Sequence, residues 1–232
     1  MKRSFINKLI DEAIVFFTEQ KFCLPPWAFF TPQEWMEYRK EAKGIFTPGL
    51  GWDVTSFGSD DFFHCGLLLF TLRNGVLDNP EYPKTYAEKI MVVRENQVTP
   101  LHFHWYKKED IINRGGGNLV IELFRADPAA KKLAGGEFTI EVNGFTKNMK
   151  SGEKLILAPG DSVCFEPIHA HRFYGESGSG TVLAGEVSMV NNDSTDNCFI
   201  DAQIRFDAIE EDEEARYLIV NDYKSEKWEI NA

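Results

Sequence analysis

The sequence lacks two features that would indicate a particular partner: an excess of basic residues and a long apolar run. The 25 Lys and Arg residues are outnumbered by 36 Asp and Glu residues, which gives a formal net charge of −11. Such a balance argues against nucleic acid and anionic membranes as partners. No window reaches about 18 uninterrupted apolar residues, the length that a membrane-spanning helix needs. We therefore expect a soluble protein, and small neutral ligands remain open.

Cysteine is also scarce. The chain contains four cysteines: Cys23, Cys65, Cys164 and Cys198. They show no C-x-x-C spacing, and we interpret them as buried thiols in a reducing compartment, not as a disulfide framework. The charged start at Met1–Arg3 resembles that of a signal peptide, but charged residues at Lys8, Asp11 and Glu12 interrupt the apolar region that should follow. Both features predict a cytoplasmic protein.

The remaining composition is that of a well-cored globular protein. Hydrophobic residues make up 43% of the 232 positions, and 19 of them are Phe. A chain of this length can form one all-β domain. We expect a single domain over residues 1–232, with a helical or irregular N-terminal part over residues 1–60 and a β-barrel with a C-terminal segment over residues 61–232.

Two helices are predicted in the N-terminal part. Apolar residues from Ile6 to Phe17 recur at helical spacing on one face, so a helix beginning near Ser4 should pack on a larger body. Thr31–Glu34 (TPQE) is a capping box with proline at the first helical position, and it predicts a second helix to about Ala42. The segment from Gly49 to Phe57 has no clear periodicity.

The rest of the chain predicts antiparallel β-structure. Phe62–Leu72 should be a strand buried on both faces, with His64 as a hydrogen-bonded core residue. Asn143-Gly144 is the clearest hairpin turn. The acidic run Glu210–Glu214 should be a solvated turn or helix start. Further strands are expected at Glu88–Val93, Pro100–Tyr106, Asp110–Ile112, Leu119–Phe124, Phe138–Val142, Gly144–Thr146, Lys154–Leu157, Ser162–Glu166, His171–Tyr174, Gly180–Val190, Phe199–Phe206 and Tyr217–Val220.

One stretch carries the strongest chemical signal. His102 and His104 alternate on a predicted strand, so their side chains point to one face, and Glu109 follows after a short turn. Further along, His169 or His171 could supply another imidazole from a different strand. Three imidazoles and one carboxylate that converge on a point are typical of a metal site. Two alternating histidines alone could instead be a polar strand face.

These motifs together resemble the two sequence signatures of the cupin superfamily of antiparallel jelly-roll barrels. The first match is the HxH-x4-E spacing with Gly115–Gly117, and the second is Pro159–Asp161 followed by P-x-x-x-H at Pro167. The resemblance implies one divalent metal held by four ligands: His102, His104, Glu109 and His171. We prefer His171 to His169 because Arg172-Phe173 follows it, as in many cupins.

A longer string, His102–Gly117 (HFHWYKKEDIINRGGG), is similar to the D-lyxose isomerase family. Other matching segments are Gly185–Ser188, Asn191–Asp193, Asp196-Asn197 and Ile209–Glu214. This resemblance implies a manganese-dependent aldose–ketose isomerase, with other ions such as Co²⁺ possible, that is typically a homodimer. Its substrates would be D-lyxose and D-xylulose, and also D-mannose and D-fructose.

Isomerisation of this kind needs proton carriers near C1 and C2 of the sugar. Glu186 and Lys107 are the candidate base and acid, because each shares strand parity with a neighbour expected to face the cavity. A nearby cation would lower the pKa of the lysine, and burial could raise that of the glutamate. Alternatively, Lys107 or Lys108 lies in a solvated turn, and Glu186 pairs with Arg205.

Further residues could contact a sugar. Asp201 and Arg205 are candidate binders of sugar hydroxyls, although either could lie on the surface. Trp105, Phe165 and Phe173 could offer stacking faces, but core packing is the better default in so aromatic a chain. Two other functions stay open: a cupin that uses its metal for dioxygen chemistry, and a barrel that binds sugars without turnover.

Overall fold

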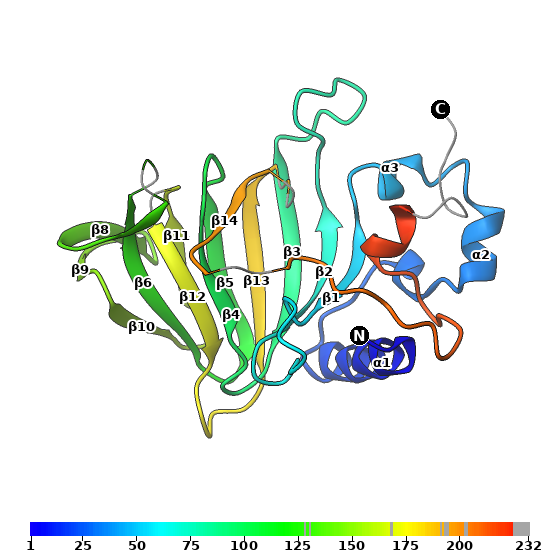
Figure 1. Ribbon diagram of the computed structural model, residues 1–232, viewed down its shortest axis with the longest axis horizontal. Helices are drawn as coiled ribbons and strands as arrows, with labels where there is room; N and C mark the ends of the chain where they lie inside the picture. Colours follow the sequence, from blue (N-terminus) through cyan, green and yellow to red (C-terminus); the bar gives the residue numbers. More distant parts are fainter. Residues whose placement is uncertain are drawn as a thin grey trace.

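Two antiparallel sheets, shown in Figure 1, face each other across a shared apolar core. The computed structural model describes residues 1–127, 129, 131–167, 169–190, 192, 195–201 and 204–224. In spatial order, the eight-stranded sheet contains β1 (Gly51–Thr55), β2 (Leu67–Arg73), β3 (Tyr86–Val93), β13 (Val182–Met189), β5 (Glu109–Gly116), β11 (Ser162–Phe165), β8 (Glu137–Val142) and β9 (Phe145–Lys150). The six-stranded sheet contains β10 (Glu153–Leu157), β6 (Leu119–Asp127), β12 (His169–Gly175), β4 (Thr99–His104) and β14 (Asn197–Phe199), with β7 (Lys132–Ala134) paired to β6.

Strand parity explains which residues fill the space between the sheets. In β6, Leu119, Ile121 and Leu123 are all fully buried in this core, whereas Glu122 between them faces outward and pairs with Arg172. One face of β6 is thus wholly apolar, whereas the other is mixed, with buried Val120 next to the ion pair of Glu122. The predicted all-β barrel is confirmed.

The outer face of β1, β2 and β3 is covered by the N-terminal helices. The described helices are α1 (Arg3–Glu19), α2 (Pro32–Glu37) and α3 (Lys43–Phe46), with 3-10 turns at η1 (Pro26–Phe29) and η3 (Val220–Lys224), and they gather beside β1 in Figure 1. In β2, Leu67 and Leu69 face the core between the sheets, while Leu68 and Phe70 pack with α1. A strand covered on both sides needs no polar face, which explains the run of apolar residues. None of the helices in the described ranges is long and apolar enough to cross a membrane.

The element boundaries differ from the prediction in three places in the first part of the chain. Residues 62–66 form a turn and an isolated bridge, so β2 begins at Leu67 and His64 is exposed instead of buried. Helix α2 has the predicted capping box but ends at Glu37. The segment from Gly49 to Phe57, which has no clear periodicity in the sequence, contains β1, whose five residues are all buried. Because both faces of β1 are covered, it has no alternation that the sequence could reveal.

Other predictions are confirmed or corrected in the second part. Asn143-Gly144 joins β8 to β9 with both residues at positive φ (53° and 80°), the conformation of a two-residue hairpin turn. The last two predicted strands are largely wrong. Of Phe199–Phe206, only Phe199 lies in a strand, at the end of β14, and residues 202 and 203 lie outside the described ranges. Tyr217–Val220 has only an isolated bridge from Ile219 to Trp52. All four cysteines are free, but Cys23 is exposed and the other three are only partly buried, so the expectation of buried thiols is wrong.

The acidic run near the end of the chain does not form a helix. It lies against the start of α1 and provides Glu211, one of the two carboxylates that pair with a buried arginine. The Arg3 side chain is 2% exposed, and its guanidinium contacts Glu211 at 2.7 Å and Asp222 at 2.6 Å. The N-terminal ammonium donates a hydrogen bond to the Ala208 carbonyl. The two ends of the described chain are therefore joined by charged contacts.

We expect Arg3→Met to lower the free energy of unfolding by about 3 kcal/mol, because it keeps the aliphatic stem but leaves Glu211 and Asp222 without their shared cation. Urea unfolding measures this change. The matched control is Arg216→Met, because the Arg216 side chain is 58% exposed where it pairs with Asp11, and a surface pair contributes about 0.5 kcal/mol. Equal losses in both variants would contradict a special role for the buried arginine.

Candidate active site

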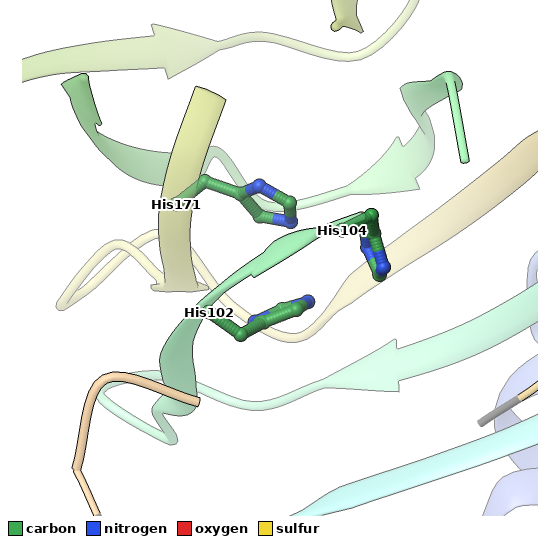
Figure 2. A group of neighbouring side chains, drawn as sticks. All are labelled: His102, His104 and His171. Carbon is green, nitrogen blue, oxygen red and sulfur yellow. The ribbon is translucent and has the colours of Figure 1, made fainter. Parts of the chain in front are cut away.

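Three imidazoles converge between the two sheets. His102 and His104 project from β4 to the same face, and His171 lies directly across from His102 on the neighbouring β12. Figure 2 shows these three side chains pointing into one space. One ring nitrogen of each lies within 4.8 Å of those of the others, and all three residues are buried. The HxH spacing places two nitrogens there, and the strand register adds the third.

Backbone carbonyls orient two of the three rings. His102 Nδ1 lies 2.7 Å from the Pro100 carbonyl, and His171 Nδ1 lies 3.1 Å from the His169 carbonyl. A carbonyl oxygen can only accept, so both Nδ1 atoms carry the proton and both Nε2 atoms present a lone pair. This arrangement is typical of histidines that bind a metal through Nε2.

The donor set fits a divalent metal ion. Burial, with the neighbouring imidazoles, holds the pKa of His102 well below its usual value, and burial also lowers the pKa of His104, so both rings favour the neutral, ligating form. His104 Nε2 and Glu109 Oε1 are buried and have no hydrogen-bond partner among the described residues. Unsatisfied buried acceptors are costly, and a cation between them would remove that cost.

Glu109 brings its carboxylate to the histidines from the opposite sheet. It is the first residue of β5, and its Oε1 lies 3.0 Å from His104 Nε2 and 3.2 Å from His171 Nε2. Burial alone would raise the pKa of Glu109, but the nearby His104 and the Lys107 ammonium hold it well below its usual value. Glu109 therefore places an ionised carboxylate beside the three imidazoles.

Lys107 and Glu186 lie next to this cluster and contact each other. Lys107, in the turn between β4 and β5, places Nζ 2.7 Å from Glu109 Oε2 and 2.8 Å from Glu186 Oε1. Glu186 projects from β13 and also accepts a hydrogen bond from the Ser188 hydroxyl. Glu186 thus pairs with Lys107 and not with Arg205, whose partner is Asp53 at 2.5 Å.

The charge states of this pair differ from the sequence-based expectation. Burial would lower the pKa of Lys107, but the carboxylates of Glu109 and Glu186 raise it well above its usual value. Burial would raise the pKa of Glu186, but the lysines beside it lower it. At neutral pH the pair is consequently an ammonium and a carboxylate. The first can donate a proton and the second can accept one.

A further lysine was not predicted from the sequence. Lys89 lies opposite Glu186 in the register of β3 and β13, and its Nζ is 3.2 Å from Glu186 Oε1. It shares strand parity with Met91, which faces the core. A charged residue at a core-facing position of an apolar strand was the available signal. Lys89, Lys107, Glu109 and Glu186 are each less than 10% exposed, and their formal charges cancel.

The cavity between the sheets contains most, but not all, of the predicted site residues. Its polar lining comprises Lys89, Thr99, His102, His104, Lys107, Glu109, His171, Glu186, Asn197 and Arg205. Its apolar lining comprises Phe57, Leu67, Leu69, Met91, Ile111, Phe173 and Phe199. Asp201 is exposed and is not part of this lining. Phe165 stacks on His171 at 4.3 Å between ring centroids, and Trp105 packs on Phe103 outside the cavity.

The structure also separates the residues that compete for the same roles. His169 Nδ1 accepts a hydrogen bond from the Glu166 backbone N–H, and its ring packs on Phe138, so it does not join the cluster. Lys108 is half exposed and pairs with Glu166. His171 and Lys107 are thus the members of these pairs that face the cavity, whereas Asn191 and Asp193 of the matched motif lie outside the described residues.

An antiparallel barrel with a buried His₃ cluster beside a carboxylate defines a cupin-type protein with a candidate metal centre. Comparison with known proteins extends this assignment. The family model for D-lyxose isomerase matches residues 1–223, and the chain belongs to that family. The chain is 47% identical over 225 residues to the D-lyxose/D-mannose isomerase of Escherichia coli O157:H7, covering 97% of this chain and 99% of that protein. It is 48% identical over 224 residues to the enzyme of that name from Serratia proteamaculans, with 96% and 98% covered. Its class is therefore a sugar isomerase.

Solved structures support the fold assignment. The L-ribose isomerase of Acinetobacter sp. DL28, in complex with L-ribose, superposes with a TM-score of 0.57 at 15% identity, covering 90% of this chain and 98% of that one. The L-ribose isomerase of Cellulomonas parahominis with L-ribose gives a TM-score of 0.55 at 14% identity, with the same coverage. At these identities the likeness establishes the common fold alone.

Proposed function

We propose that this enzyme interconverts D-lyxose and D-xylulose, and also D-mannose and D-fructose, through a cis-enediolate. The observation that carries the proposal is the contact between Lys107 and Glu186 immediately beside the buried imidazole cluster. An acid and a base next to a cation site are what a proton shift between two adjacent carbons requires. The names of the two sequence relatives supply the two aldoses, D-lyxose and D-mannose, and the two ketoses are their isomerisation products.

The metal in this proposal is held by His102, His104, Glu109 and His171. Three neutral imidazoles and one carboxylate suit Mn²⁺ or Co²⁺, and the family resemblance favours manganese. A bound divalent ion supplies positive charge that stabilises negative charge developing on the sugar oxygens. The charges of the four buried lysine and glutamate side chains cancel, so they would not offset this positive charge.

The proton transfers use the pair beside the metal site. Glu186, held as a carboxylate, removes the proton from C2 of the aldose and returns it to C1 on the same face of the enediolate. Lys107, held as an ammonium, donates a proton to O1 and accepts the proton of O2. Each group ends the cycle in its starting state, and the product differs from the substrate only in the positions of these two protons.

Polar groups at the cavity wall would bind the remaining hydroxyls. Arg205 is held by Asp53 and lines the cavity, which supports the predicted contact with the sugar. Lys89 lines the same wall next to Glu186. Asp201 is exposed, so its predicted role in sugar binding has no support from its position.

Two further parts of the proposal concern the setting of the enzyme. We place it in the cytoplasm, because all four cysteines are free and such thiols persist in a reducing compartment. We also propose a homodimer, as the family resemblance implies. Light scattering coupled to size-exclusion chromatography measures the mass, which should be twice the 26.5 kDa of the chain.

The function is tested by removing and restoring the metal. Purified protein is analysed for metal, treated with a chelator, and assayed on a panel of aldoses with each divalent ion added back. We expect chelation to abolish isomerisation and Mn²⁺ or Co²⁺ to restore it, with D-lyxose and D-mannose among the substrates. Oxygen consumption would indicate a dioxygenase instead, and tight sugar binding without turnover would indicate a binding protein.

The choice of fourth ligand gives a separate prediction. His171→Ala should reduce metal binding strongly, because it removes an Nε2 that faces the cluster. His169→Ala is the matched control on the same strand and should keep its metal, because that ring packs on Phe138 outside the cluster. Metal content of the two purified variants decides the matter, and the opposite ranking would mean that His169 is the ligand.

A further inference from the structure

Asp196, which directly precedes β14, has a buried carboxylate that contacts the turn between β4 and β5. Its Oδ1 accepts a hydrogen bond from the Tyr106 N–H at 2.8 Å, and its Oδ2 accepts one from the Lys107 N–H at 3.2 Å. Its backbone carbonyl accepts a third from the Trp105 N–H at 3.1 Å. Three successive residues of the turn are thus attached to one aspartate, and Lys107 is among them.

The same carboxylate faces one of the imidazoles. His104 Nδ1 lies 3.6 Å from Asp196 Oδ2, and the side chains of both residues are less than 10% exposed. Backbone carbonyls hold the Nδ1 atoms of His102 and His171, but His104 Nδ1 has no hydrogen-bond partner within the described ranges. A movement of about 0.7 Å would bring this nitrogen within ordinary hydrogen-bond reach of the carboxylate, at ~2.9 Å.

We infer that Asp196 is a positioning residue for both halves of the site: it receives the Nδ1 proton of His104, so that Nε2 keeps its lone pair for the metal, and it holds the turn that directs Lys107 at Glu186. The inference rests on the proposed metal-dependent function and adds a residue to it. A carboxylate suits this position because it accepts at both oxygens, whereas an amide has one accepting oxygen and would present an N–H to the ring.

The test uses Asp196→Asn, which keeps the size of the side chain, and cobalt as the metal probe. With an amide N–H facing Nδ1, the imidazole adopts the other tautomer, with its proton on Nε2. We expect the variant to bind Co²⁺ about 10- to 100-fold more weakly than the wild-type protein. At saturating Co²⁺ we expect a changed visible absorption spectrum and a lower kcat with little change in KM, because the turn that holds Lys107 is loosened.

Asp207→Asn is the matched control. The Asp207 carboxylate also fastens a loop, accepting hydrogen bonds from the backbone N–H groups of Ser56 and Gly58, but it is not part of the cavity lining. We expect this variant to lose stability in urea while keeping the Co²⁺ affinity and spectrum of the wild-type protein. A loss of affinity equal to that of Asp196→Asn would reduce the role of Asp196 to loop packing and would overturn the inference.

A double-mutant cycle tests the route through His104. In a His104→Gln background, Asp196→Asn should cost little further Co²⁺ affinity, because the ring that it positions is gone. Additive losses would overturn the inference, as would wild-type affinity and spectrum in Asp196→Asn. The second variant is Asp196→Ser, whose side chain is too short to reach the ring. If neither variant folded, Asp196 would be a residue that stabilises the fold, and the inference would be overturned. Wild-type protein that binds no Co²⁺ would instead overturn the proposed function.

Discussion

Glu186→Gln should lower kcat by about 100-fold or more while leaving metal content and sugar binding nearly unchanged. The amide keeps the shape of the side chain, and it can still accept a hydrogen bond from the Ser188 hydroxyl, but it cannot take a proton from carbon. Because Glu186 lies beside the four proposed ligands and is not one of them, metal binding is spared. Steady-state kinetics with the metal restored, together with metal analysis of the purified variant, measures both expectations.

Glu122→Gln is the control for this substitution. Glu122 is also a buried carboxylate with cationic partners, Arg172 and Lys154, but it lies on the outer face of the six-stranded sheet. We expect it to lose some stability and keep its kcat.

A parallel measurement in D₂O tests the mechanism of proton transfer. A proton held on Glu186 exchanges with solvent, so deuterium then enters the product at carbon. Product without carbon-bound deuterium, with near-normal turnover of Glu186→Gln, would contradict the enediolate mechanism.

The second large effect is expected from the histidines of β4. His102→Ala and His104→Ala should each weaken metal binding by about 100-fold or more, lower the bound metal well below one ion per chain, and abolish isomerisation. Each substitution removes one of the three nitrogens that converge on the proposed metal. Metal analysis after dialysis, followed by calorimetric titration with Mn²⁺, gives the occupancy and the affinity.

His64→Ala provides the comparison for these variants. His64 lies in an exposed turn before β2, so its loss should change neither metal content nor activity. Metal retention at wild-type level in both His102→Ala and His104→Ala would place the metal elsewhere and would contradict the ligand set. Retention in only one of them would remove that histidine from the set and leave the site itself in place.

The predictable part of the site is the part encoded by local spacing. Two histidines separated by one residue on a strand must share a face, so His102 and His104 could be paired without a structure. Lys107 was preferred from its parity with Glu109, but setting Lys108 aside needed the geometry of the turn, because adjacent residues in a turn have no fixed parity. Lys89 could not be connected to Glu186, because the pair depends on the register between β3 and β13 across 97 residues of sequence.

The same distinction holds for the fold. Strands such as β6 were predicted as short β-rich runs between turn signals, and the Asn143-Gly144 turn was predicted from its need for positive φ. Strand β1 was missed because its five residues are all buried. Its Asp53 is explained only by Arg205, which lies 152 residues away. Contacts between distant segments decide such positions, and no local pattern records them.

The contacts between Arg3 and the acidic run have a consequence for the order of events during synthesis. Arg3 and Glu211 are 208 residues apart, so at ~5–20 residues per second a ribosome needs about 10–40 s to produce the second after the first. During that interval α1 can form, but Glu211 and Asp222, the partners of its arginine in the folded chain, have not yet been made. The later part of the chain also carries Arg205 to the cavity wall, so α1 gains its ion pairs and the cavity its full lining only after residues 205–222 have been synthesised.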